Sequence, residues 1–386
     1  MVQGCRIAII GGGPAGIMTA ALLGTNFDIT IFDPKPLLAT LLPTGGGKCN
    51  LAYAEYDFKE FTKNYPRGEK FLYSIFSRYC TAETIEYFNS IGVETITLEN
   101  GKIFPKEMSA KFVREKLLAQ IKNCHIEKAL VTKIEQKNEQ FIIHTQNSKS
   151  LFNKVIVTTG GHCDFNFLKE LGIEINTPRP ALTGLCTKES FSDLSGIVLK
   201  NITNKETKLS DDMLFTHFGI SGPLIFKISS LKARDEFPYE LSFDIIGDKI
   251  SDTKFLQAIL NKNPHKEIKN ILSEFLPKNF VPSLLNSLNI TESITGCKID
   301  GKTRDKIFET LKNYKITITK PRPDGETVMC GGVDLKQINP KTLEHKTIKN
   351  LFFAGEVLDI DGFCGGFNLQ NCWSGAYIIS KSIFYD

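Results

Sequence analysis

The sequence predicts an α/β fold in which a nucleotide-binding Rossmann-type domain is interrupted by an inserted module. Three observations support this prediction. The chain opens with "RIAIIGGGPAGIMTAALLG", it ends with a second glycine-rich stretch in "FFAGEVLDIDGFCGGFNLQNCWSGAYI", and the region between them changes to short β-like runs and a helical block. Glycine-rich segments at both ends of a chain, with a different sequence pattern between them, indicate two pieces of one domain around an insert.

The first segment has the pattern of a strand, a glycine turn and a helix. An apolar run over residues 6–10 leads into G-x-G-x-x-G at Gly11, Gly13 and Gly16, and a helical pattern follows. In such a turn the first glycine allows the tight bend, the second lets the backbone approach a pyrophosphate, and the third lets helix and strand pack closely. The start of the helix offers unpaired N–H groups and its positive dipole end to phosphates.

The next strand, "DITIFD", ends in an acidic residue. Asp33 lies 22 positions after Gly11, and an acid that binds the adenosine ribose is expected after about 20 positions. A glycine triplet alone would indicate only a turn. Strand, helix and acid in this register predict a dinucleotide site.

The rest of the first 182 residues is expected to complete this domain. It contains the glycine turn "TGGGKCN", a helical stretch from about Glu69 to Ile91, and a hairpin formed by "EKALVTKIEQ" and "QFIIHTQ". The buried strand "KVIVTTGG" is expected to lie beside the first strand. Its end at Thr159 and Gly160 would then reach the edge of the sheet where ligands bind.

The inserted module is expected to have a β part and a helical part. Short β-like runs begin at about Thr183 and reach "YELSFDII", a helical block rich in Asn, Lys and Leu follows, and "KITITK" and "ETVMCGGVDL" return to a β pattern. The predicted division is residues 1–182 and 337–386 for the Rossmann-type domain, 183–250 and 312–336 for the β-rich insert, and 251–311 for a helical subdomain.

The C-terminal glycine turn predicts which dinucleotide is bound. NAD needs one glycine-rich cradle, whereas FAD must be held at the pyrophosphate and again at the isoalloxazine ring. "NLFFAGE" reads as a strand ending at Gly355 and Glu356, near the ribityl chain, and a helix begins at about Asn368. A helix N-terminus facing the flavin stabilises the negative charge of reduced flavin. The alternative is a glycine-capped loop before a surface helix.

The ordered motifs "GGGPAG", "TGGGKCN", "GKIFP", "TTGG", "LFTHFGISGP", "GGV" and "FFAGEVLDIDGFCGGFNLQ" span the whole chain. In this order they resemble the BaiN-like NAD(P)/FAD-dependent oxidoreductases, aminoacetone-oxidase-type FAD-binding flavoproteins with an insert domain. The resemblance implies a glutathione-reductase-like FAD domain, a β-barrel-like insert and a small helical subdomain. It leaves the substrate open, because members are linked both to reduction of unsaturated bile-acid intermediates and to amine oxidation.

The chain departs from the family pattern in two places. Members usually carry glycine, a basic residue and lysine where this chain has Leu38, Ala39 and Thr40, so less positive charge is expected near the cofactor phosphates. Lys35 or Lys48 would substitute. The residues after "TGGGKCN" also differ, which leaves side-chain contacts at Ala52 and Tyr53 open.

The motifs and the resemblance together define the expected cofactor contacts. They are Gly11, Gly13, Pro14, Ala15, Gly16, Asp33, Lys35, Gly45, Gly46, Gly47, Lys48, Cys49, Asn50, Val131, Thr159, Gly160, Gly355, Glu356, Asp361, Gly365, Gly366, Asn368 and Leu369.

Few residues are candidates for proton or thiol chemistry. His217 in "LFTHFGISGP" is the candidate catalytic proton donor, because imidazole titrates near neutral pH, although a lone histidine is more often structural. Asp359 and Asp361 could either handle protons or hold the C-terminal loop, and the loop-holding role is favoured. Cys49 has no second cysteine five residues later, so a packed thiol is expected and a redox disulfide is not; Cys364 is a candidate exposed thiol without an assigned role.

Composition excludes several other classes. The net charge is only +4 with scattered lysines, which predicts no nucleic-acid partner, and no segment offers about 18 consecutive apolar residues for a membrane span. The ten cysteines form no C-x-x-C pair and no metal-ligand cluster, and in the absence of a secretory pattern they indicate cytoplasmic thiols.

These features predict an FAD-dependent oxidoreductase that passes hydride through flavin N5. NADH or NADPH is the candidate electron donor, and it would bind only transiently against the flavin, because no second G-x-G-x-x-G is present. The acceptor is expected to be an unsaturated or carbonyl-type small molecule. The open alternatives are an FAD-dependent amine oxidase, a non-catalytic flavin-binding or regulatory protein, and a flavoprotein that acts on tRNA. A plain NAD dehydrogenase would leave the C-terminal turn without a role.

Overall fold

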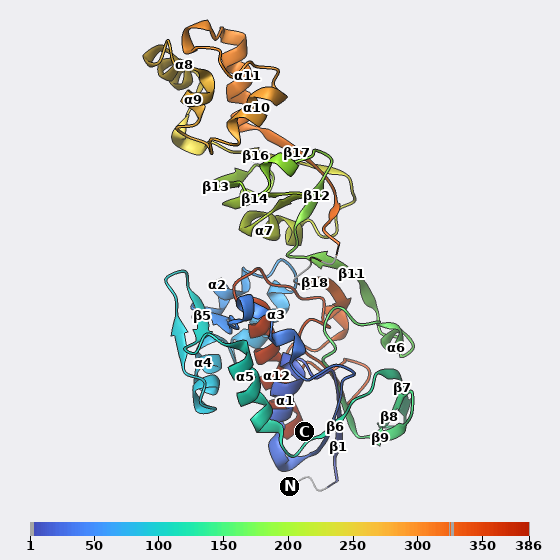
Figure 1. The fold of residues 1–386 in the computed structure, drawn as a ribbon. Helices are drawn as coiled ribbons and strands as arrows, with labels where there is room; N and C mark the ends of the chain where they lie inside the picture. The colour runs from blue at the N-terminus through green and yellow to red at the C-terminus, as the bar shows by residue number, and fades with distance from the viewer. Residues whose placement is uncertain (1–3, 324, 326–327, 386) are drawn as a thin grey trace. The chain divides into compact units, whose positions relative to one another are not determined.

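The computed structural model describes residues 4–323, 325 and 328–385, and the chain divides into two compact units (Figure 1). Unit 1 is Met1–Arg179 together with Val328–Asp386, and unit 2 is Pro180–Thr327. Unit 2 is therefore inserted into unit 1 along the sequence.

A five-stranded parallel sheet forms the centre of unit 1, in the order β19-β10-β1-β2-β6. Ile10 lies opposite Phe32 on one side and Val157 on the other, and Val157 lies opposite Phe353. The expected pairing of "KVIVTTGG" with the first strand is thus confirmed. The strands are β1 (Arg6–Ile10), β2 (Asp28–Phe32), β6 (His125–Glu127), β10 (Lys154–Val157) and β19 (Leu351–Phe353).

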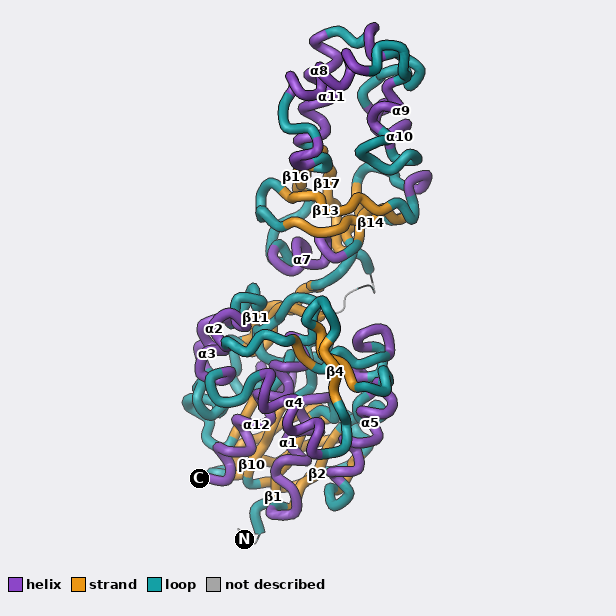
Figure 2. Tube along the Cα trace, turned by 90° about the vertical axis from the view of Figure 1, so that its left-hand side faces the viewer, coloured by secondary structure: helices purple, strands orange, loops and turns teal. Residues whose placement is uncertain are grey.

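Both faces of this sheet are covered, which explains why its inner strands read as continuous apolar runs. Helices α1 (Pro14–Leu23) and α12 (Phe367–Tyr385) lie on one face (Figure 2). The other face is covered by a three-stranded antiparallel sheet of β7 (Val131–Lys137), β8 (Gln140–Thr145) and β9 (Lys149–Phe152). The ring of Phe152 packs edge-on against Phe32, with ring centroids 5.7 Å apart. The predicted β7–β8 hairpin is confirmed.

The predicted helical stretch from Glu69 to Ile91 is two helices. The first helix ends at Phe76, and the chain is non-helical at Cys80, where the Glu83 side chain accepts a hydrogen bond from the Cys80 N–H at 2.8 Å and starts a new helix. The apolar periodicity did not reveal this break. The surrounding elements are β3 (Ala52–Tyr53), α2 (Phe58–Thr62), α3 (Glu69–Phe76), α4 (Thr81–Ser90), β4 (Thr95–Thr97), β5 (Lys102–Pro105) and α5 (Ala110–Leu118).

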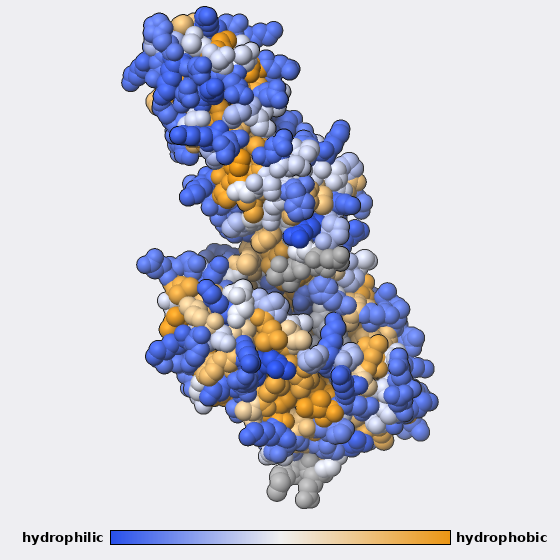
Figure 3. Space-filling model, viewed as in Figure 1, coloured by the Kyte–Doolittle hydropathy of each residue, from blue (hydrophilic) through white to orange (hydrophobic). Residues whose placement is uncertain are grey.

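Unit 2 contains a closed six-stranded barrel in the order β12-β15-β14-β13-β16-β17. Its interior is apolar, with Met213, Phe215 and Ile316 fully buried. Hydrophilic residues dominate the face of α8–α11 shown in Figure 3. The elements are β12 (Leu185–Thr187), β13 (Val198–Asn204), β14 (Ser210–Thr216), β15 (Gly219–Ser221), α7 (Pro223–Leu231), β16 (Tyr239–Asp244), α8 (Thr253–Lys262), α9 (Ile268–Leu272), α10 (Val281–Ser287), α11 (Gly301–Lys312) and β17 (Tyr314–Pro321).

The barrel and the Rossmann-type sheet confirm the predicted fold class. A separate helical subdomain over residues 251–311 stays a prediction. Helix α6 (Asn166–Lys169) and a two-stranded sheet of β11 (Ile175–Ala181) and β18 (Val328–Val333) complete the fold. Within the described part of the chain, no helix has both the length and the apolar character needed to cross a membrane.

Candidate functional site

The carboxyl ends of the parallel strands bring three loops to one edge of the unit 1 sheet. These loops follow β1, β10 and β19, which are neighbours in the sheet. A Cβ atom added to Gly355 would lie 3.2 Å from the Cβ of Ala15, so the end of the last strand contacts the first turn of α1. Segments from opposite ends of the sequence therefore meet where ligands bind in sheets of this type.

The first glycine turn is shaped by close backbone contacts. Gly11 has a φ of +108°, and a Cβ at Gly16 would lie 2.1 Å from the carbonyl oxygen of Gly11, so the helix packs directly against the turn. Gly13 is different, because a Cβ there would approach only Thr40 Oγ1, at 3.7 Å, among the described residues. Gly13 is the N-cap of α1 and has no side chain to cap the helix, so the space beside the helix start is not filled by an N-cap side chain.

Asp33 is held beside this turn. Its carboxylate accepts hydrogen bonds from the N–H of Gly12 at 2.7 Å and of Lys35 at 2.8 Å. Its own N–H donates to the carbonyl oxygen of Glu127 at 3.2 Å, which brings the segment before β7 to the same end of the sheet. Val131 is the first residue of β7 and is buried. Lys35 is exposed.

The second glycine turn, at residues 44–50, adopts left-handed backbone conformations. Gly45, Gly46 and Gly47 have φ values of +58°, +67° and +84°, and Cys49 follows at +63°. The turn glycines and Lys48 are exposed, whereas Cys49 is buried. Burial raises the pKa of the Cys49 thiol to about 12, against a smaller lowering by the Thr44 hydroxyl. The thiolate is therefore disfavoured, which argues against redox chemistry at this residue.

The second turn contacts the C-terminal turn directly. With its amide oriented to satisfy its neighbours, the Asn50 side chain accepts from the Gly366 N–H at 3.1 Å and donates to the Ala52 carbonyl oxygen at 3.0 Å. A Cβ at Gly366 would lie 2.6 Å from that same oxygen. The indole N–H of Trp373 donates to the Leu51 carbonyl oxygen at 3.0 Å. These contacts fix the start of α12 against residues 50–52.

Glu356 lies in the turn after the last strand, because β19 ends at Phe353 and not at the predicted Gly355 and Glu356. Its side chain accepts a hydrogen bond from the Met329 N–H. The pKa of Glu356 is raised to about 7, chiefly by burial; the hydrogen bond from the Met329 N–H lowers it, and the nearby charge of Asp361 adds a smaller increase. A Cβ at Gly161 would come within 3.1 Å of the Glu356 carboxylate. The loop after β10, with Thr159 and Gly160, thus lies beside this acid.

The two aspartates of the C-terminal loop hold that loop to the rest of unit 1. Asp361 is fully buried and forms a two-point ion pair with Arg67. Asp359 accepts from the Asn176 side chain at 2.8 Å and from the Gly331 N–H at 3.0 Å.

The start of α12 is held in a similar way. The Asn368 side chain bonds both backbone groups of Gly362 at 2.8 Å. Gly365 and Gly366 have positive φ values, and Leu369 in the first turn of α12 is half-buried. Direct contacts of Asp361, Asn368 and Leu369 with the cofactor stay predictions.

His217 belongs to unit 2, in the turn between β14 and β15. Its side chain is exposed, and its ring packs edge-on against Phe218 with centroids 5.3 Å apart. A catalytic role for His217 stays a proposal. Cys364, before the C-terminal glycines, is exposed as well.

The residues of unit 1 fit FAD. The uncapped start of α1 and the space at Gly13 suit a pyrophosphate, and Asp33 offers carboxylate oxygens for a ribose at the adjacent strand end. At the other end of the edge, Glu356 and the start of α12 would face the ribityl chain and the flavin ring. The residues that hold the cofactor would thus come from both ends of the sequence.

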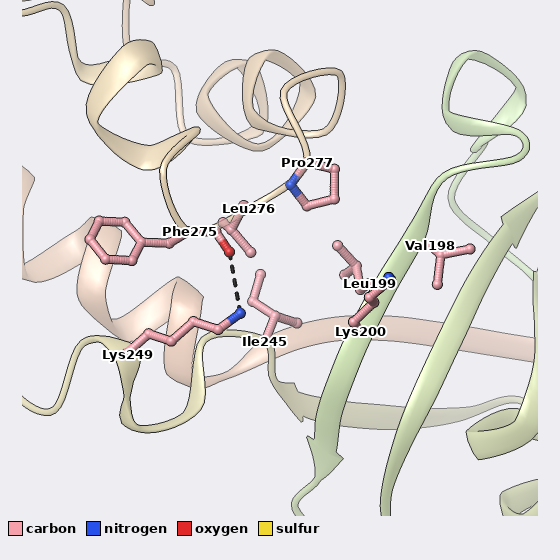
Figure 4. A pocket seen from close by; sticks show the side chains of 8 residues that line it. All are labelled: Val198, Leu199, Lys200, Ile245, Lys249, Phe275, Leu276 and Pro277. Carbon is pink, nitrogen blue, oxygen red and sulfur yellow. Dashed lines mark hydrogen bonds between the residues drawn. The ribbon is translucent and has the colours of Figure 1, made fainter.

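A cavity of about 200 Å³ lies within unit 2 (Figure 4). Six of its eight lining residues are apolar and two are lysines, and Lys249 donates to the Phe275 carbonyl oxygen at 3.4 Å. No predicted site residue lines it. The lining residues are Val198, Leu199, Lys200, Ile245, Lys249, Phe275, Leu276 and Pro277.

Sequence reasoning missed several residues that build the site. Gly12, Arg67, Met329 and Trp373 carry contacts described above, but the motif analysis assigned no role to these four positions. One signal was available for Arg67: Gly68 follows it at the start of a helix, and a Cβ at Gly68 would lie 2.8 Å from the Ile360 side chain. A glycine at a helix start without a capping side chain can mark such a close approach.

Comparison with known proteins agrees with this geometry. Residues 5–382 match the family described as HI0933-like protein Rossmann domain. The chain is 25% identical to the 3-dehydro-bile acid delta(4,6)-reductase of Clostridium scindens, over 98% of each chain. It is 28% and 24% identical to proteins named ribosomal RNA dihydrouridine synthase from Haemophilus influenzae and Escherichia coli, over 99% and 97% of each chain.

The fold and the site define a flavoprotein of the Rossmann type. The chain belongs to the HI0933-like family, the BaiN-like group that its motifs resemble, and it is an FAD-dependent oxidoreductase. Two relatives are named for an activity on RNA, which opposes the expectation of no nucleic-acid partner.

Proposed function

We propose that this chain is an NAD(P)H-dependent reductase of an activated double bond, in an unsaturated or carbonyl-type small molecule. The observation that carries the proposal is the junction of two glycine turns from opposite ends of the chain, through Asn50, Gly366, Trp373 and Leu51. A site built this way supports both halves of a long dinucleotide. Bound FAD supplies hydride chemistry at its N5 atom.

The protein's own residues prepare this site. The start of α1 and Asp33 hold the adenosine and phosphate part, and Glu356 orients the central part. The ion pair of Arg67 with Asp361 fixes the loop beside the ring, because it is largely excluded from water. His217 is proposed as the proton donor to the substrate, since its side chain is exposed and histidine is the residue most often used as a general acid.

The names of relatives support reduction over oxidation. One relative is named a delta(4,6)-reductase and two are named dihydrouridine synthases, and both kinds of name describe the addition of hydrogen to a ring. An amine oxidase has no such support among these three relatives.

Anaerobic titration with NADH and then NADPH tests the proposal. The visible flavin bands should bleach with one equivalent of one of these donors, and a 3-oxo-4-ene steroid or a similar conjugated carbonyl should restore them. Flavin that neither donor bleaches, but that an amine reduces, would overturn the reductase assignment in favour of the oxidase.

Uridine in ribosomal RNA is a second candidate substrate. Two relatives with that activity in their names match nearly the whole chain. The reaction class is the same, because the double bond of uracil is also conjugated to a carbonyl. The weak net charge of +4 argues against it, since RNA-binding surfaces are usually strongly basic. Measuring dihydrouridine in ribosomal RNA after incubation with the enzyme and donor decides between the candidates, with a His217→Gln enzyme as a comparison.

A further inference from the structure

We propose that the Thr40 hydroxyl binds a phosphate oxygen of the FAD pyrophosphate. Thr40 lies in the loop after β2, outside the glycine turns. This contact would hold the cofactor at a position where the chain lacks the basic residues expected from the family pattern. It does not depend on the identity of the substrate.

The position of Thr40 is the first observation. A Cβ atom placed on Gly13 would lie 3.7 Å from Thr40 Oγ1, and no other non-adjacent heavy atom of the described residues comes within 4 Å. Gly13 is the N-cap of α1, so this hydroxyl stands across a narrow space from the uncapped helix start. A group bound at the start of α1 would have the Thr40 hydroxyl on the side that faces away from the helix.

The loop that carries Thr40 is fixed to the glycine turn. The Leu38 N–H donates to the Gly12 carbonyl oxygen at 2.8 Å, and Leu38 itself has a φ of +57°. A Cβ on Gly12 would lie 2.2 Å from the Leu37 side chain, and Arg114 Nε donates to the Leu37 carbonyl oxygen at 2.8 Å. Because residues 37 and 38 are held on both sides, Thr40 has a defined place relative to the helix start.

The Thr40 side chain is available for a ligand. It is exposed, and its hydroxyl forms no hydrogen bond with another residue in the described ranges. A hydroxyl can donate to a phosphate oxygen, and such a charge-assisted bond is stronger than a neutral one.

The test is the affinity of the flavin-free full chain for FAD and for ADP. Thr40→Val keeps the shape and removes the hydroxyl, and it should raise the dissociation constants of both ligands about tenfold. Thr40→Ser should bind like the wild type. Thr25→Val is the matched control, because Thr25 is also exposed but lies in the segment after the other end of α1.

Thr40→Lys extends the test. A lysine facing the phosphates should tighten FAD binding and make it more sensitive to salt. Dissociation constants of the Thr40→Val protein for FAD and ADP within twofold of the wild-type values would overturn the proposal. So would weaker FAD binding with unchanged ADP binding, since the hydroxyl would then contact another part of the cofactor. These measurements use no electron donor or acceptor, so their failure is distinct from failure of the proposed reductase activity.

Discussion

The indole N–H of Trp373 donates to the carbonyl oxygen of Leu51 at 3.0 Å, across 322 positions of sequence. Both residues are fully buried. The bond joins the first turns of α12 to the residues that follow the second glycine turn. Trp373 is the only tryptophan of the chain, and its place in the structure gives it a role in positioning the two turns.

Trp373→Phe should therefore lower both stability and cofactor affinity. The change leaves the Leu51 carbonyl oxygen buried without its donor and removes part of a fully buried ring, so we expect a loss of about 2–4 kcal/mol in the free energy of unfolding. Denaturant titration measures this loss. FAD affinity should fall in the folded variant, and unchanged affinity would show that the bond does not position the turns.

Two alanine substitutions in the first glycine turn should separate folding from cofactor binding. Gly16→Ala places a Cβ 2.1 Å from the Gly11 carbonyl oxygen, so it should destabilise unit 1 by about 1–3 kcal/mol or more. Gly13→Ala meets no such contact and has a φ of −79°, which alanine adopts. It should keep its stability within about 0.5 kcal/mol but lose at least about tenfold in FAD affinity. A Gly13→Ala protein that retains FAD normally would contradict the assigned cradle.

The buried ion pair of Arg67 and Asp361 should matter more than a surface pair. Asp361→Asn leaves the Arg67 charge without its buried partner charge, and we expect a loss of about 3–5 kcal/mol in the free energy of unfolding. Glu94→Gln is the matched control. Glu94 pairs with Lys106 at 2.9 Å while both side chains are mostly exposed, so its loss should be below about 1 kcal/mol. Equal losses would show that burial of the pair is unimportant.

Glu356 should make the stability of the flavin-free protein depend on pH. Its pKa is raised to about 7 from the ordinary carboxyl value of 4.5, so the folded state binds more protons than the unfolded state between these values. Stability should then fall as pH rises from 4.5 to 7, and the loss is complete above about pH 7. Glu356→Gln should be more stable than the wild type at pH 8 and equal to it at pH 4. Parallel pH profiles for the two proteins would refute the assignment.

The cysteines near the site should differ sharply in reactivity. Cys364 is exposed, whereas Cys49 is buried and its pKa is raised to about 12. An alkylating reagent at pH 8 should modify Cys364 in the native protein and leave Cys49 unmodified until the protein unfolds. Peptide mass mapping measures both sites, and Cys364→Ser should remove the rapid modification of that peptide, while Cys297, which is also exposed, still reacts. Rapid labelling of Cys49 would show that its turn opens in solution.

Local sequence determined the Rossmann-type elements of this protein. Residues 6–33 contain strand, turn, helix and acid within one short stretch, and each depends on neighbours in the chain: Gly16 packs on Gly11, and Asp33 reaches the N–H of Gly12. The strands β10 and β19 could be predicted from their continuous apolar runs, because both faces of the sheet are buried. The family, the fold class and FAD as cofactor followed from these motifs.

Only the tertiary structure decided how the distant pieces meet. The start of α4 after the break is capped by one side chain, Glu83, and the ion pair of Arg67 with Asp361 joins residues 294 positions apart. Such contacts leave no periodic trace in sequence, because a buried charge or carbonyl group needs only one partner, which can come from anywhere in the chain. The raised pKa of Glu356 likewise arises from its surroundings, since burial acts on the carboxyl group only after the loops have closed around it.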